Sequence, residues 1–61
     1  MITKEEMMQM LFSKLAELQD LIEENNESVL TARLQVEVAL LYNILGEDVP
    51  EEYWEQIEEV I

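Results

Sequence analysis

Side chains able to act as a nucleophile or a general base near neutral pH are almost missing from this sequence. It contains no histidine and no cysteine, the residues that most often serve these roles. Ser13 stands beside Lys14, but the pair lies within a helical pattern without a glycine-rich turn or oxyanion donors nearby. We interpret this pair as structural, and we expect no catalytic residue and no enzymatic activity.

Carboxylates are the one reactive group present in abundance, with fifteen Asp and Glu against three Lys and Arg. Paired carboxylates perform acid and base chemistry inside a cleft, whereas these fall on convex helical faces. The calcium-binding loop pattern is absent, and carboxylate-bridged metal bundles normally add histidines. The single glycine, Gly46, leaves no phosphate-binding loop. We therefore expect no metal ion and no cofactor.

The formal net charge of −12 restricts the partners. A field of this sign repels nucleic acid and anionic membranes and attracts basic protein surfaces, so we expect a protein partner, with no direct nucleic-acid or membrane binding. The hydrophobic content of 49% argues against disorder. The first residues lack a signal-peptide pattern, and no apolar run approaches the roughly 20 residues of a membrane span, which predicts a cytoplasmic protein.

Helical periodicity fills most of the chain and predicts an all-α fold. We expect a single domain, 1–61, with helices at about 3–24, 27–45 and 48–61. Thr3 and Glu6 have the spacing of a capping box, Gly46 suits a left-handed C-terminal cap, and Pro50 suits a first helical turn. Asp48 and Glu51 have capping-box spacing as well.

The apolar pattern differs between the two long helices. The first has one stripe through Met8 and Leu18, whereas the second has two opposed stripes, one through Leu34 and Val38 and one through Val36. In a lone three-helix bundle each helix meets its neighbours across one arc, so two opposed stripes indicate a second chain. The residues predicted to self-associate are Val29, Ala32, Val36, Ala39, Leu40, Met8, Leu11 and Leu15.

A chain of 61 residues without disulfides or a histidine metal site has few sources of stability other than oligomerisation. We therefore predict a homodimeric helical bundle, with long antiparallel helices 1 and 2 and a short docked helix 3. Parallel and antiparallel dimers both remain open. Arg33 is expected to pair with Glu37 or with a neighbouring helix, or alternatively across the dimer.

The last predicted helix has an apolar face and an acidic face. Trp54 lies on the apolar face and is expected to dock this helix against the core. Six carboxylates along about 16 Å of continuous helix give roughly one per 3.3 Å, close to the spacing of about 3.4 Å in a DNA strand. Charge runs are usually solvated faces; the alternative is a site for a basic partner. The predicted partner-binding residues are Asp48, Glu51, Glu52, Glu55, Glu58 and Glu59.

These patterns lead to one main functional hypothesis and two alternatives. The main hypothesis is a small acidic, non-catalytic protein-interaction module, a homodimeric regulator or adaptor. The first alternative is an inhibitor that imitates nucleic acid and occupies a basic DNA- or RNA-binding site through its carboxylate face. The second is adaptation to high salt, which is disfavoured because such proteins are rich in Asp and this chain has only Asp20 and Asp48.

Overall fold

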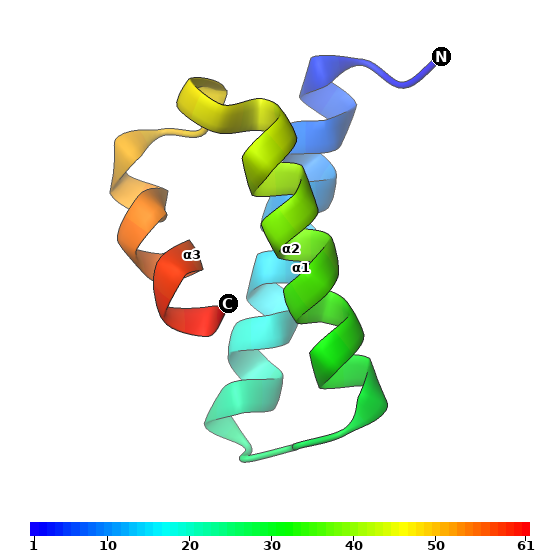
Figure 1. Ribbon diagram of the computed structural model, residues 1–61, viewed down its shortest axis with the longest axis vertical. Coiled ribbons are helices and arrows are strands. Elements are labelled where there is room, and N and C mark those ends of the chain that lie inside the picture. Colours follow the sequence, from blue (N-terminus) through cyan, green and yellow to red (C-terminus); the bar gives the residue numbers. More distant parts are fainter.

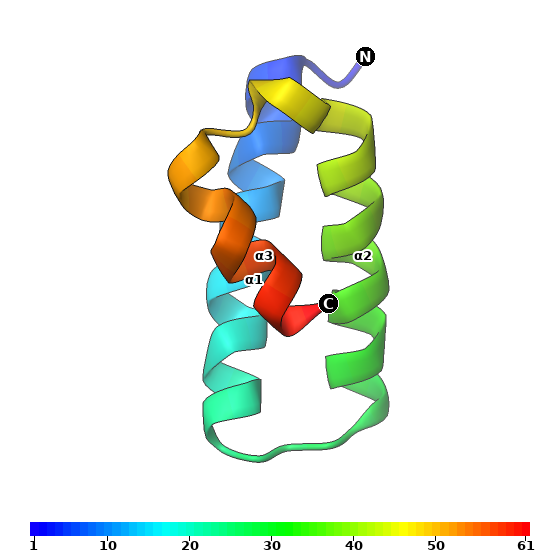
Figure 2. The same cartoon turned by 60° about the vertical axis from the view of Figure 1, so that its left-hand side comes forward.

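The protein is all-helical and has no strand, in a computed structural model that describes residues 1–61. Two long helices, α1 (Lys4–Glu23) and α2 (Val29–Leu45), are followed by two short 3₁₀ turns, η1 (Gly46–Asp48) and η2 (Glu51–Tyr53), and by α3 (Trp54–Val60). The chain descends through α1, turns, and returns alongside it as α2 (Figure 1). The turned view places α3 over one side of the α1–α2 pair (Figure 2). The prediction of three helices is confirmed.

Local hydrogen bonds fix both ends of α1. The Thr3 hydroxyl accepts a hydrogen bond from the Glu6 amide at 3.1 Å, as the capping pattern predicts. At the other end Asn25 has a positive φ of 57°, and the Asn26 amide donates to the Leu21 carbonyl at 2.9 Å. This is a Schellman motif, and asparagine tolerates the left-handed conformation that it needs. The motif reverses the chain, so α2 returns along α1.

The ends of α2 also follow from its sequence. The Ser28 hydroxyl accepts from the Thr31 amide, and the Thr31 hydroxyl donates to the Asn26 carbonyl, which ties the connecting loop to the first turn of the helix. Gly46 ends α2 with a φ of 52° and a ψ of −121°. The positive φ was expected, but this ψ is outside the left-handed helical region. Only glycine adopts such a backbone without strain.

The third helix begins later than the sequence indicated. Val49 and Pro50 have extended backbones, with ψ of 125° and 136°. For Val49 this follows from its place before a proline, where the helical region is disfavoured. Val49 is fully buried, and its carbonyl accepts a hydrogen bond from the Trp54 indole at 2.8 Å. The predicted helix over 48–61 is therefore wrong at its start, and no cap by Asp48 forms there.

The core lies where the three helices meet. The Phe12 and Tyr53 rings pack with their centroids 4.6 Å apart and join α1 to η2. Trp54 is half-buried against the same core, which agrees with its predicted role in docking the last helix. The buried apolar residues are Leu11, Leu15, Leu18, Leu34, Val38, Leu45, Val49, Ile57 and Val60.

Substituting Gly46 tests the turn after α2. A Cβ at this position meets no atom within 4 Å, so Gly46→Ala introduces backbone strain without a steric clash. We expect it to lower the free energy of unfolding by about 1–3 kcal/mol, measured by urea denaturation with circular dichroism. Asn25→Gly relieves a positive φ and is the matched control, expected to raise stability by up to about 1 kcal/mol. Equal stability of Gly46→Ala and the wild type would contradict this backbone geometry.

Candidate protein-interaction surface

The side of α2 that faces away from the core is apolar. Its large side chains are 56% to 86% exposed, and spacings of three and four residues place them on one face of the helix. Arg33 and Asn43 are the only polar residues among them. Contiguous exposed apolar surface on a small protein commonly marks a binding site. We call this surface the α2 outer face, and its members are Val29, Ala32, Val36, Leu40 and Ile44.

The opposite side of the same helix belongs to the core. Leu34, Val38 and Leu45 are almost completely buried. At 100° per residue, Val36 and Val38 point about 200° apart, so one stripe packs within the chain and the other remains in solvent. The two-sided pattern inferred from the sequence is thus present in the fold. A second chain on the outer stripe stays a prediction.

Four of the predicted self-association residues lie elsewhere. Leu11 and Leu15 are 0% and 3% exposed and belong to the core, so assigning them to an interface between chains was wrong. Met8 is half-buried against the same core, and Ala39 is half-buried. The periodicity of α1 identified its buried face correctly, but α2 and α3 of the same chain cover that face. Ile44 belongs to the α2 outer face but was not among the residues predicted to self-associate.

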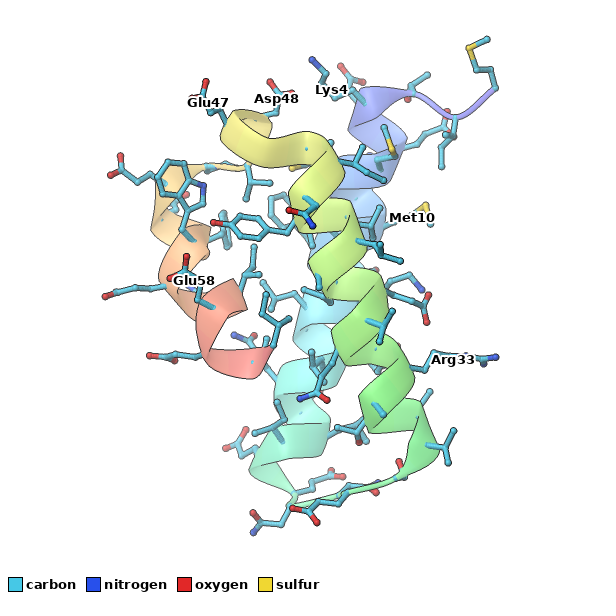
Figure 3. The ribbon with its side chains drawn as sticks, in the orientation of Figure 1. Lys4, Met10, Arg33, Glu47, Asp48 and Glu58 are labelled. Carbon is cyan, nitrogen blue, oxygen red and sulfur yellow. The ribbon has the colours of Figure 1, made fainter.

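Two of the three basic side chains of the chain form ion pairs, and the third does not. Lys14 on α1 pairs with Glu37 on α2, and Lys4 pairs with Asp48 at 3.1 Å. The predicted pair between Arg33 and Glu37 is wrong, because Lys14 reaches Glu37 from the facing helix. Arg33 forms no ion pair and extends into solvent on the side of α2 away from α3 (Figure 3). No member of the α2 outer face is a carboxylate; Glu37 borders the face but is paired with Lys14, and Arg33 beside it is a free cation.

The six predicted partner-binding carboxylates are all exposed, but they lie on three segments. Asp48 lies on η1 and is paired with Lys4. Glu51 and Glu52 lie on η2, and the remaining three, Glu55, Glu58 and Glu59, lie on α3. The single continuous helix expected for all six is therefore absent: the extended Val49–Pro50 segment separates Asp48 from the other five, which lie on a 3₁₀ turn followed directly by α3. Apart from Asp48, none of the six forms an ion pair.

Metal ligation and membrane insertion are alternative uses of acidic clusters and apolar helices. No three carboxylates lie close enough together to hold a metal ion. The expectation that no apolar run approaches the length of a membrane span was wrong, because the segment Val29–Asp48 has the length, 20 residues, and the mean hydropathy, 1.2, of a short one. Core helices of water-soluble proteins reach the same values, so these two properties alone do not assign it to a bilayer.

Comparisons of the chain with protein-family models, curated proteins and solved structures found no match. Function is therefore inferred from the residues and their arrangement. The surface that distinguishes this fold most clearly is the α2 outer face, because it combines apolar side chains with an absence of carboxylates in a chain of net charge −12.

A matched pair of truncations tests which leucines belong to the core. Leu15→Ala removes a buried side chain and is expected to lower the free energy of unfolding by about 2–5 kcal/mol. Leu40→Ala makes the same chemical change at a position that is 56% exposed and is expected to cost less than about 1 kcal/mol. Both values come from urea denaturation at the lowest measurable protein concentration. Equal losses would contradict the placement of Leu15 in the core.

Proposed function

We propose that this chain is a small acidic, non-catalytic protein-interaction module that assembles as a cytoplasmic homodimer and acts as a regulator or adaptor. The observation that carries the proposal is the α2 outer face. Val36 and Leu40 lie near its centre, each more than half exposed. Removing apolar surface from water contributes about 25 cal/mol per Å², so covering this face stabilises an assembly.

Charge favours a second copy as the occupant of this face. Two chains of net charge −12 repel each other, and most of their surfaces bring carboxylates together. The α2 outer face contains none and lies beside the free Arg33, so two copies approach there at the least electrostatic cost. An anionic membrane is a poorer occupant, because the net charge of the whole chain opposes its approach.

The small core supports the same conclusion. Only 10 of the 61 residues are buried, and there is no disulfide to compensate. Domains of this size usually need an additional source of stability. A second copy against the α2 outer face supplies further apolar burial, which makes α2 a central helix of the dimer.

An antiparallel arrangement of the two α2 helices fits the charges best. A parallel pair places Arg33 beside its own copy, and like charges at close range are unfavourable. In an antiparallel pair Val36, near the middle of α2, lies close to the twofold axis. The two Arg33 side chains then lie on opposite sides of this axis, which separates the like charges.

The acidic surface supports a second candidate function, imitation of nucleic acid. The observation in its favour is that the five carboxylates of η2 and α3 are exposed and have no cation partner within the chain. A basic DNA-binding site is attracted to such a surface. The interrupted helix weakens the comparison with a phosphate backbone, so this function stands second.

Charge insertion tests the homodimer. Val36→Glu places a carboxylate at the centre of the α2 outer face, and Ser13→Glu adds the same charge at an exposed position of α1. By sedimentation equilibrium at micromolar concentration, we expect the wild type and Ser13→Glu to be dimers and Val36→Glu to be a monomer of unchanged helix content. A monomeric wild type, or equal masses for the two variants, would contradict the proposal.

Single cysteines test the orientation within the same experiment, because the chain has none of its own. A disulfide needs Cα atoms roughly 4.4–6.8 Å apart. Under mild oxidation we expect Val36→Cys chains to crosslink and Val29→Cys chains to remain single. Crosslinking of Val29→Cys as fast as Val36→Cys would indicate a parallel dimer instead.

Charge reversal tests the second candidate. The probe is a labelled DNA duplex bound to a basic DNA-binding domain. The wild-type chain is added as a competitor, and release of the DNA from the domain is measured. If the carboxylates imitate phosphates, Glu51→Lys, Glu55→Lys and Glu59→Lys together abolish displacement, which also weakens steeply with salt. The matched control reverses Glu5, Glu17 and Glu23 on α1 and keeps the same net charge. Equal displacement by both triple variants eliminates this function.

A further inference from the structure

A hollow between the end of α2 and the start of α3 combines aromatic and acidic side chains. Its volume is about 300 Å³, at the lower end of the range for ligand sites, which suits one side chain better than a cofactor. Tyr42 comes from α2, Glu47 from η1 and Trp54 from α3. Asn43 and Gly46 complete the lining.

The fold fixes the aromatic part of this hollow before any ligand arrives. The Trp54 indole donates its hydrogen bond to the Val49 carbonyl at 2.8 Å, so the ring is held by the chain itself. Tyr42 and Trp54 are half-buried, since each packs partly against the core and partly borders the hollow. Gly46 adds no side chain, and the space at its Cβ position is open.

No cation of this chain serves the hollow. Lys4 pairs with Asp48 and Lys14 with Glu37, whereas Arg33 extends from the far side of α2 (Figure 3). Glu47, at the end of the molecule where α2 leads into η1, forms no ion pair. A carboxylate and two aromatic side chains are thus available to a cation from another molecule.

We propose that the Tyr42–Trp54 hollow binds the cationic side chain of a lysine or arginine from a basic partner protein. Aromatic rings attract cations through their negative faces, and Glu47 provides the opposite charge. The net charge of −12 guides a basic segment toward the molecule. Asn43 borders both surfaces, but none of the apolar residues of the α2 outer face lines the hollow, so we expect the hollow to bind separately from self-association.

Trp54 provides the readout, because it is the only tryptophan in the chain. The probe is pentalysine, titrated while tryptophan fluorescence and the indole NH chemical shift are recorded. Glu47→Gln and Tyr42→Leu are each expected to weaken binding about three- to tenfold. Glu23→Gln removes the same charge from an exposed position at the end of α1 and is expected to change affinity less than twofold.

Equal affinities for the wild type, Glu47→Gln and Tyr42→Leu would overturn the proposal, since pentalysine would then respond to net charge alone. Glu47 is exposed, so Glu47→Gln keeps the test valid if Tyr42→Leu fails to fold. The titration is repeated on Val36→Glu. If Val36→Glu binds pentalysine as the wild type does, the hollow is separate from the dimer interface. Loss of binding by Val36→Glu would overturn this separation, and the homodimer itself is tested by sedimentation.

Discussion

Helix geometry places the apolar residues of α2 on two opposite sides, one buried in the core and one exposed to solvent. Leu34 and Val38 turn toward α1 and α3 and enter the core, so Val36 and Leu40 must point outward. None of α1, η1, η2 and α3 covers them in this fold. The small core, the uncovered face and the proposed second copy all follow from this single constraint.

The distribution of charge reinforces that division of the surface. Carboxylates occupy the exposed positions of α1, η1, η2 and α3, yet none lies on the α2 outer face. Lys4 and Lys14 are used in pairs between elements of the chain, while Arg33 is left beside the apolar residues. Two acidic exteriors repel each other, and this repulsion is weakest where carboxylates are absent. The same net charge attracts basic molecules, and on these grounds we propose two binding surfaces within 61 residues.

Much of this fold could be predicted from local sequence signals. Thr3 and Gly46 mark helix ends through short-range capping geometry, and both positions were identified from the sequence, although the ψ of Gly46 differs from that of a left-handed helical cap. The start of α3 was missed because burial of Val49 and its bond from Trp54 select an extended backbone before Pro50. Local capping signals cannot predict the tertiary contact between Val49 and Trp54.

The candidate surface was predictable only in part, for a similar reason. Periodicity places Leu11 and Val36 on apolar stripes but does not say which chain covers each one, and Leu11 proved to be covered from within. The pairing of Glu37 with Lys14 instead of Arg33 depends on the approach of two helices. The spacing along α2 alone predicted Arg33, four residues away, as the partner of Glu37. Contacts between elements therefore account for most of the corrections.

The central claim is that the α2 outer face of one chain packs against the same face of another. Isotope-filtered nuclear Overhauser spectroscopy on a mixture of ¹³C-labelled and unlabelled chains measures this contact directly. We expect intermolecular effects between the methyl groups of Val36 and Leu40 in one copy and the outer-face methyl groups of the other. Absence of such effects at millimolar concentration, with relaxation rates of a monomer, would contradict it.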